Sequence, residues 1–199
     1  IDMLSSTGGN HVIAGNYIGT DKTGRAISSG NKIGMRIGVG GPNVRIGTNY
    51  DGISDSEESN IVASVTATPL TLIGTVNNIE ALILQGNYLG TNPYNDDLVV
   101  VSGVGSVLIN NPVEGSLLRG NVISNSLSGG VWNQELSTTN NSGNTFRQNQ
   151  IYNNESLGIA LNNNTEPTAN DTGDSDTGPN NLMNYPEIEK VTYLSGGRY

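Results

Sequence analysis

The stretch GNYIGTD at residues 15–21 returns almost unchanged as GNYLGTN at residues 86–92. Duplication of a whole segment is typical of a structural module that stacks on copies of itself, whereas a catalytic loop has no reason to be repeated. Weaker copies share its pattern, an Asn with one apolar residue three positions before it and another two positions after it. The clear copies lie at 13–18, 84–89, 118–123 and 146–151, and a degenerate copy lies at 60–65.

The spacing of these copies indicates coils wound one upon another. Asn87, Asn121 and Asn149 are separated by 34 and 28 residues, which are periods of stacked repeats. Other short apolar runs lie between the copies, bounded by Gly, Asn, Ser and Thr, and none continues with a helical period. They form a second set at 34–38, 70–74, 98–101, 130–133 and 158–162, and a third set at 44–46, 79–82 and 107–109.

Strands this short cannot bury a face alone, but they can when each pairs in parallel with its counterpart one coil away. We therefore predict an all-β protein, a parallel β-helix (solenoid) of about five coils with three short strands per coil. The repeated Asn shares its parity with the inward apolar residue two positions later, so we expect a ladder of hydrogen-bonded amides inside a corner. The predicted interior columns are Ile13, Leu84, Leu118, Phe146 and Ile18, Leu89, Ile123, Ile151.

Composition excludes several classes of partner and chemistry. The net charge is −9, and the nine Lys and Arg residues are scattered, so nucleic acid and anionic membrane surfaces are not expected partners. No apolar run approaches 18 residues, so we expect no transmembrane helix. The chain has no Cys, which excludes disulfides, thiol catalysis and Cys-based zinc sites. The acidic, Gly-rich and Asn-rich composition fits an extracellular or cell-surface location.

Three segments carry a family resemblance. GNYIGTDKTG, NVISN and NDTGDSDTGPNNLMNYPEI resemble repeats of large bacterial surface or secreted proteins that form right-handed parallel β-helices. The resemblance implies that the β-helix is right-handed and extends over 1–181, including an acidic exit loop at 164–181. It also implies a closing segment over 182–199 that begins a truncated β-sandwich-like module. That family has no single activity, so the resemblance favours a structural or adhesive module of a larger protein.

The ends of the chain carry a further expectation. The chain begins at Ile1, and residues 1–9 are too polar and short to form an apolar cap. Because the first coil would otherwise present unpaired strand edges, we expect more coils or another chain to cover it. The chain would then be an interrupted piece of a longer protein.

No catalytic constellation is recognisable, so we lean towards a protein that is not an enzyme. The only His, His11, has no Ser and Asp pattern around it, and the carboxylates lie mainly in loops. Arg119 and Arg147 occupy equivalent outward positions in neighbouring coils. A polysaccharide lyase or hydrolase, or a carbohydrate-binding module, is the first alternative, because sites on such folds are assembled across coils. A phage or filament component is the second.

The acidic exit loop is the one candidate metal site with a recognisable ligand set. Asp171, Asp174 and Asp176 lie within six residues of Gly-rich chain, and calcium takes such carboxylate and carbonyl oxygens. We predict calcium there, locking the loop so that the residues after it dock beneath the last coil, and a solvated acidic turn is the alternative. The acidic run at 51–58 is a weaker second candidate.

Three aromatic residues are candidate sugar contacts. Tyr17 and Tyr88 share an outward parity beside the repeated Asn, and Trp132 lies in a short strand. Exposed rings of this kind can stack on sugars, although Tyr is also simply a good strand residue. Polysaccharide or other surface proteins are therefore the expected partners.

Overall fold

The structure, a computed structural model, consists mostly of parallel β-sheet with almost no helix. Among the described residues, neither the helix α1 (Asp55–Glu58) nor the 3₁₀ helix η1 (Pro179–Leu182) has the length and apolar character to cross a membrane. The structure describes residues 1–3, 9–28, 33–38, 43–63, 69–73, 79–98, 105–110, 113–134, 141–162 and 164–192.

The described strands form three large parallel sheets and one small one. Sheet A contains β1 (Asp2–Met3), β4 (Met35–Ile37), β7 (Leu70–Ile73), β11 (Val107–Asn110), β15 (Val131–Gln134) and β18 (Ile159–Leu161). Sheet B contains β2 (Val12–Ile13), β5 (Arg45–Gly47), β9 (Ile83–Gln85), β13 (Leu117–Arg119) and β16 (Thr145–Arg147). Sheet C contains β3 (Tyr17–Ile18), β6 (Ile61–Val62), β10 (Tyr88–Leu89), β14 (Val122–Ser124) and β17 (Gln150–Tyr152). The small sheet pairs β8 (Ile79–Glu80) with β12 (Val113–Glu114).

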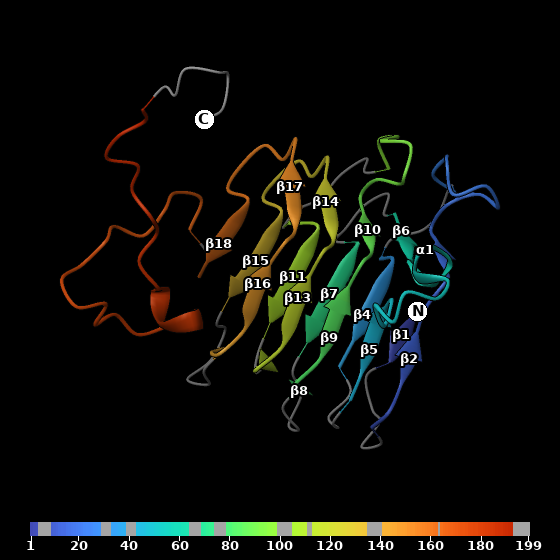
Figure 1. The fold of residues 1–199 in the computed structure, drawn as a ribbon, viewed down its shortest axis with the longest axis horizontal. Helices are drawn as coiled ribbons and strands as arrows, with labels where there is room; N and C mark the ends of the chain where they lie inside the picture. Colours follow the sequence, from blue (N-terminus) through green and yellow to red (C-terminus); the bar gives the residue numbers. More distant parts are fainter. Residues whose placement is uncertain are drawn as a thin grey trace.

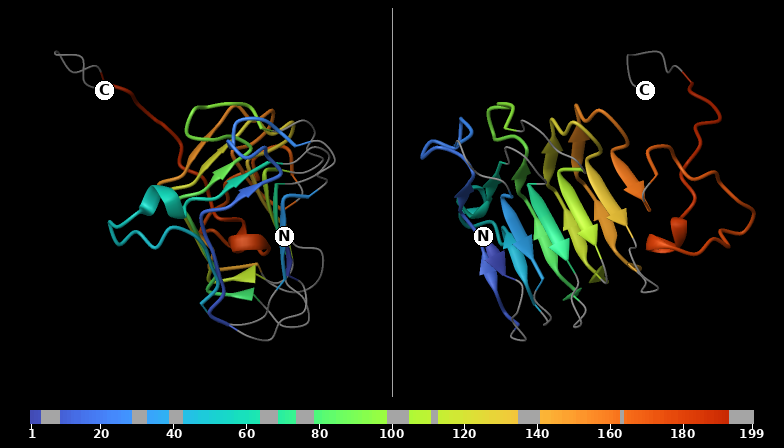
Figure 2. Two further views of the ribbon diagram at one scale, coloured as in Figure 1. Left: turned by 90° about the vertical axis from the view of Figure 1, so that its right-hand side faces the viewer. Right: turned by 180° about the vertical axis from the view of Figure 1, so that it is seen from behind.

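The chain visits the three large sheets in a fixed order. From β2 onward it passes through sheets B, C and A in turn, and each strand pairs in parallel with its counterpart from the next passage. We call one such passage a cycle. The three sheets surround a common interior when they are viewed along the stack (Figure 2, left), and successive cycles lie side by side in Figure 1. This order is compatible with a parallel β-helix or another solenoid.

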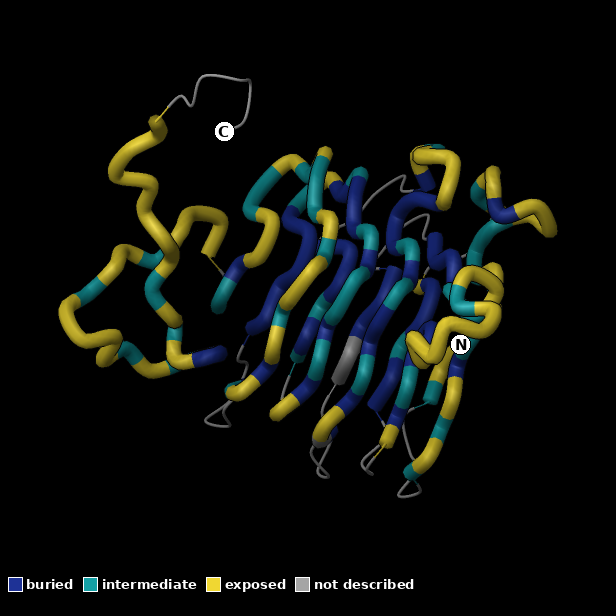
Figure 3. The backbone as a smooth tube through the Cα atoms, viewed as in Figure 1, coloured by how far each residue is buried: buried dark blue, intermediate teal, exposed yellow. Residues whose placement is uncertain are grey.

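The core consists of columns in which one inward side chain from each cycle lies on the next. Leu118 is fully buried and pairs with Leu84 on one side and Phe146 on the other, which confirms the predicted register. Burial is highest along the middle strands and falls in the segment after β18 (Figure 3). The sheet B column is Ile13, Ile46, Leu84, Leu118 and Phe146, and the sheet C column is Ile18, Val62, Leu89, Ile123 and Ile151.

Two details of the predicted strand sets are wrong. Ile46 belongs to the Leu118 column, although the sequence pattern placed it in the third set, because Asn49 three residues later is followed by Asp51 where the repeat has an apolar residue. The other members of that set separate as well: Ile79 lies in the small sheet and Val107 in sheet A. Of the run predicted at 98–101, residues 99–101 lie outside the described part of the chain.

The repeated Asn residues form the predicted ladder between sheets B and C. Each amide nitrogen donates to the amide oxygen of the next Asn at 2.8–3.0 Å, and the backbone N–H of the same residue donates to that oxygen as well. Such shared acceptors join side chain and backbone of adjacent cycles, so few buried polar groups stay unpaired there. The members are Asn16, Asn60, Asn87, Asn121 and Asn149.

A second corner column continues past the last cycle into η1. The backbone N–H of Ser116 donates to the amide oxygen of Asn144, and the N–H of Asn144 donates to that of Asn180, both at 3.0 Å. Asn180 also donates through its side chain to the Asn144 carbonyl at 2.7 Å. The exit segment therefore attaches to the stack by imitating the next cycle of an amide column.

Candidate functional site

The predicted calcium segment makes separate contacts at its carboxylates. Asp171 accepts hydrogen bonds from the backbone and hydroxyl of Ser175 at 3.1 and 2.6 Å, and the hydroxyl contact is the main reason that the pKa of Asp171 is lowered. Asp174 instead accepts from the backbone N–H of Asn184 at 2.9 Å. Asp171, Asp174 and Asp176 do not form a metal-binding group in the described residues, and the calcium hypothesis stays a prediction.

Beneath the last cycle lies an apolar cavity of about 440 Å³. Phe146, Ile159 and Leu161 line it from the stack, and Met183 and Tyr185 line it from the closing segment. The Met183 and Tyr185 side chains remain 54% and 44% exposed, respectively. They therefore line the cavity on the side opposite the last cycle but do not fill it. The direct attachment of the segment comes from Asn180, which the sequence interpretation missed.

The three candidate sugar-binding aromatics lie in different surroundings. Tyr17 and Tyr88 both lie on sheet C, separated by Ile61 in the same outward row. Tyr17 is 53% exposed, whereas Tyr88 is half-buried against the neighbouring apolar cluster. Trp132 belongs to sheet A and is buried. The fold thus places the two Tyr residues in one row of sheet C, on either side of Ile61, and it places Trp132 on a different sheet.

The two copies of the GNY motif lead into loops that meet. Arg25 Nε donates to an Asp96 carboxylate oxygen at 2.9 Å, and its guanidinium lies over the Tyr94 ring at 4.5 Å. The Asn92 amide also donates to the Gly24 carbonyl at 2.8 Å. The hydrogen bond from Arg25 is the main reason that the pKa of Asp96 is lowered. The repeated motif therefore joins loops that are far apart in the sequence.

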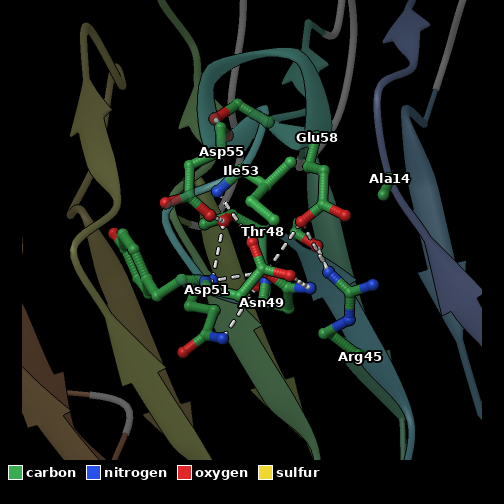
Figure 4. A network of polar contacts seen from close by, with 12 residues as sticks. Ala14, Arg45, Thr48, Asn49, Asp51, Ile53, Asp55 and Glu58 are labelled. Atoms are coloured by element: carbon green, nitrogen blue, oxygen red, sulfur yellow. Dashed lines mark hydrogen bonds and ion pairs between the residues drawn. The ribbon is translucent and has the colours of Figure 1, made fainter.

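The corner between β5 and β6 carries an inserted segment, which we call the 48–59 loop. Other cycles pass directly from sheet B to the ladder Asn, but here the chain leaves after Gly47 and returns at Asn60. Asp51 accepts from the backbone of Ile53 at 2.8 Å, and Thr48 donates to Asp55 (Figure 4). The acidic run at 51–58 thus uses its carboxylates to shape its own turns.

An ion pair fixes the 48–59 loop to sheet B. Arg45 donates to Glu58 at 3.0 Å, and the same carboxylate oxygen accepts the Asn49 backbone N–H at 2.8 Å (Figure 4). The backbone N–H of Gly15 from the preceding cycle donates to the Glu58 carbonyl at 2.8 Å. These contacts hold the loop against the outer edge of the Asn corner.

From this loop Tyr50 extends across the corners of the next two cycles. A Cβ built at Gly120 would lie only 2.1 Å from the Tyr50 hydroxyl oxygen, and one at Gly86 would lie 3.2 Å from it. Arg119 stacks on the Tyr50 ring at 4.7 Å. Burial raises the pKa of the Tyr50 hydroxyl, and this hydroxyl donates to the Gly120 carbonyl at 3.4 Å. The sequence analysis placed Arg119 outward correctly but gave no role to Tyr50.

Comparison with known proteins does not assign this arrangement. No family model, curated protein or solved structure gave a significant match to the chain. The candidate site is therefore defined by its contacts: the 48–59 loop, Tyr50 and the outward residues of sheet B, above all Arg119 and Arg147. This surface combines cations, an aromatic ring and amide groups, which is chemistry suited to binding.

Proposed function

We propose that this chain is a right-handed parallel β-helix of five coils, related to the repeats of bacterial surface and secreted proteins. The support for it is the fixed order of sheets B, C and A with parallel pairing between successive cycles. Parallel strands joined by a crossover are right-handed in about 98% of cases, which favours the right-handed form. In a solenoid of this kind each coil contacts mainly its neighbours, so the repeats can form an extended and rigid rod.

Its function in this proposal is structural and adhesive, as a module of a larger extracellular or cell-surface protein. The observation that carries the proposal is the Asn ladder, which joins every cycle from Asn16 to Asn149. Charged groups also serve cohesion: Asp2 pairs with Arg36 across β1 and β4, and Arg25 pairs with Asp96 between loops. The Asn side chains and these ion pairs thus hold neighbouring coils together along one axis.

Antibody labelling of the source cells tests this proposal. We expect an antibody raised against the folded chain to label intact cells, and we expect mild external protease to remove the label. An intracellular antigen that is reached only after lysis would contradict a surface or secreted module.

A parallel assay for chain shortening of acidic polysaccharides tests the enzyme alternative, since turnover that depends on Arg119 or Arg147 would favour it. Ordered lateral assembly of purified protein in electron micrographs would favour a filament component.

A further inference from the structure

Two arginines on sheet B differ from the other arginines that the structure describes. Arg25, Arg36 and Arg45 each form an ion pair with a carboxylate at their own site. Within the described ranges, neither Arg119 nor Arg147 pairs with a carboxylate. In a chain of net charge −9, two unneutralised cations on one surface are unexpected if their only role is cohesion.

These two arginines are also immediate neighbours. Strands β13 and β16 pair in parallel with Arg119 directly opposite Arg147, about 4.8 Å apart at the backbone as adjacent strands are. Both side chains point outward, because Leu118 and Phe146 beside them occupy the core column. Like charges directly opposite each other destabilise a sheet, so the pair carries a cost that a bound anion would remove.

One arginine of the pair, Arg119, is held in place before any ligand binds. Arg119 is supported by the Tyr50 ring, and its Nε donates to the Gln148 side chain at 2.9 Å. Arg147 is exposed beside it. Fixed guanidinium groups match the two oxygens of a carboxylate, and they lose little side-chain entropy when they bind.

We propose that Arg119 and Arg147 form a binding site for the carboxylate of an acidic saccharide. Gln148 and the exposed Thr145 beside them offer the donors and acceptors that sugar hydroxyl groups require. The net charge of the chain and the acidic 48–59 loop repel long polyanions such as nucleic acid beyond the arginine pair, so a short acidic saccharide fits better. This inference rests on the proposed adhesive function, for which it names a ligand class.

Calorimetric titration with hexamannuronate, at low and at high salt, tests the site. The matched neutral probe is the same oligosaccharide with its carboxyl groups reduced, and a sulfated hexasaccharide and a short single-stranded DNA are the other arms. We expect Arg147→Ala to weaken hexamannuronate binding by about tenfold or more, or about 1.4 kcal/mol, because the variant removes a charge-assisted hydrogen bond. Arg25→Ala, which removes a paired arginine elsewhere, should leave the affinity unchanged.

Several outcomes would overturn the proposal. They are equal binding of the reduced probe, equal affinity of the Arg147→Ala variant, stronger binding of DNA than of hexamannuronate, and absence of binding to any carboxylated probe. Stronger binding of the sulfated probe would assign the pair to sulfate and overturn the choice of carboxylate. Circular dichroism of each variant checks that the fold is kept. A negative titration leaves the cell-surface labelling untouched, so the two proposals fail separately.

Discussion

The Asn87 amide nitrogen donates to the amide oxygen of Asn121 at 3.0 Å, and the Asn87 backbone N–H donates to the same oxygen at 3.0 Å. Both residues are fully buried. The amide nitrogen of Asn87 also donates to the Ile46 carbonyl of the preceding cycle at 3.0 Å. One side chain therefore connects three consecutive cycles, and its loss would leave buried groups without partners on both sides.

Asn121→Ala should destabilise the protein clearly. The substitution leaves buried donors of Asn87 without their acceptor, and a buried unsatisfied group costs about 1–3 kcal/mol. Urea unfolding of the wild type and the variant measures the difference in free energy. The matched control is Asn16→Ala at the end of the ladder, where the residue is half-buried and a smaller loss is expected. Equal losses at the two positions would contradict the ladder as a continuous unit.

Leu118→Ala should remove about 2–5 kcal/mol from the free energy of unfolding, as truncation of a fully buried Leu does. The cavity would open between Leu84 and Phe146, which lie on either side of it in the core column. Leu127→Ala is the control, because that side chain is 46% exposed. A loss below about 0.5 kcal/mol, which is the usual range for surface substitutions, would argue against the core register.

Gly120→Ala tests whether Tyr50 lies across the corner. Gly120 has φ +61°, and its added Cβ would meet the Tyr50 hydroxyl, whereas Gly115 has φ +62° with open space around it. We expect Gly120→Ala to cost more than Gly115→Ala, since both share the backbone strain and only the first has the clash. Combining Gly120→Ala with Tyr50→Ala should recover the difference in urea unfolding. Additive losses in the double variant would show that the two residues do not interact.

The Arg25 contact should be visible in the titration of Asp96. A pKa lowered in the folded state means that the contribution to stability is complete above the ordinary value of 3.8 and is lost as the pH falls towards the lowered pKa. NMR titration should therefore place the Asp96 midpoint below 3.8, and Arg25→Ala should raise it. Asp171 is the internal control, because its lowered pKa comes mainly from Ser175 and it has no contact with Arg25, so it should not move.

Thermal melts with calcium and with a chelator test the acidic exit loop. If Asp171, Asp174 and Asp176 bind calcium, the ion stabilises the folded state by about 2.7 kcal/mol at a hundredfold excess over Kd, and the melting temperature rises. Asp174→Ala should then abolish the difference between the two buffers. Identical melts of the wild-type protein in calcium and in chelator would leave these residues as an acidic turn shaped by Ser175 and Asn184.

The sequence by itself determined the repeating part of this protein. Parity and spacing around Asn87, Asn121 and Asn149 predicted which side chains face inward, and they predicted the ladder. This succeeded because a strand alternates its faces with a period of two, so one repeated residue fixes the register of its neighbours. The same parity placed Arg119 and Arg147 on the outside of adjacent strands.

Only the tertiary structure decided what happens where the repeat is interrupted. The insertion at 48–59 hides the place of Ile46 in the core column, and nothing local to Tyr50 reveals that it crosses two later cycles. Asn180 joins an amide column whose other members come from distant segments. The carboxylates at 51–58 and 171–176 could in principle attract a cation or satisfy their own turns. Which groups meet in such segments depends on how the cycles stack in space, and the spacing of residues in the sequence does not indicate which distant segments come together.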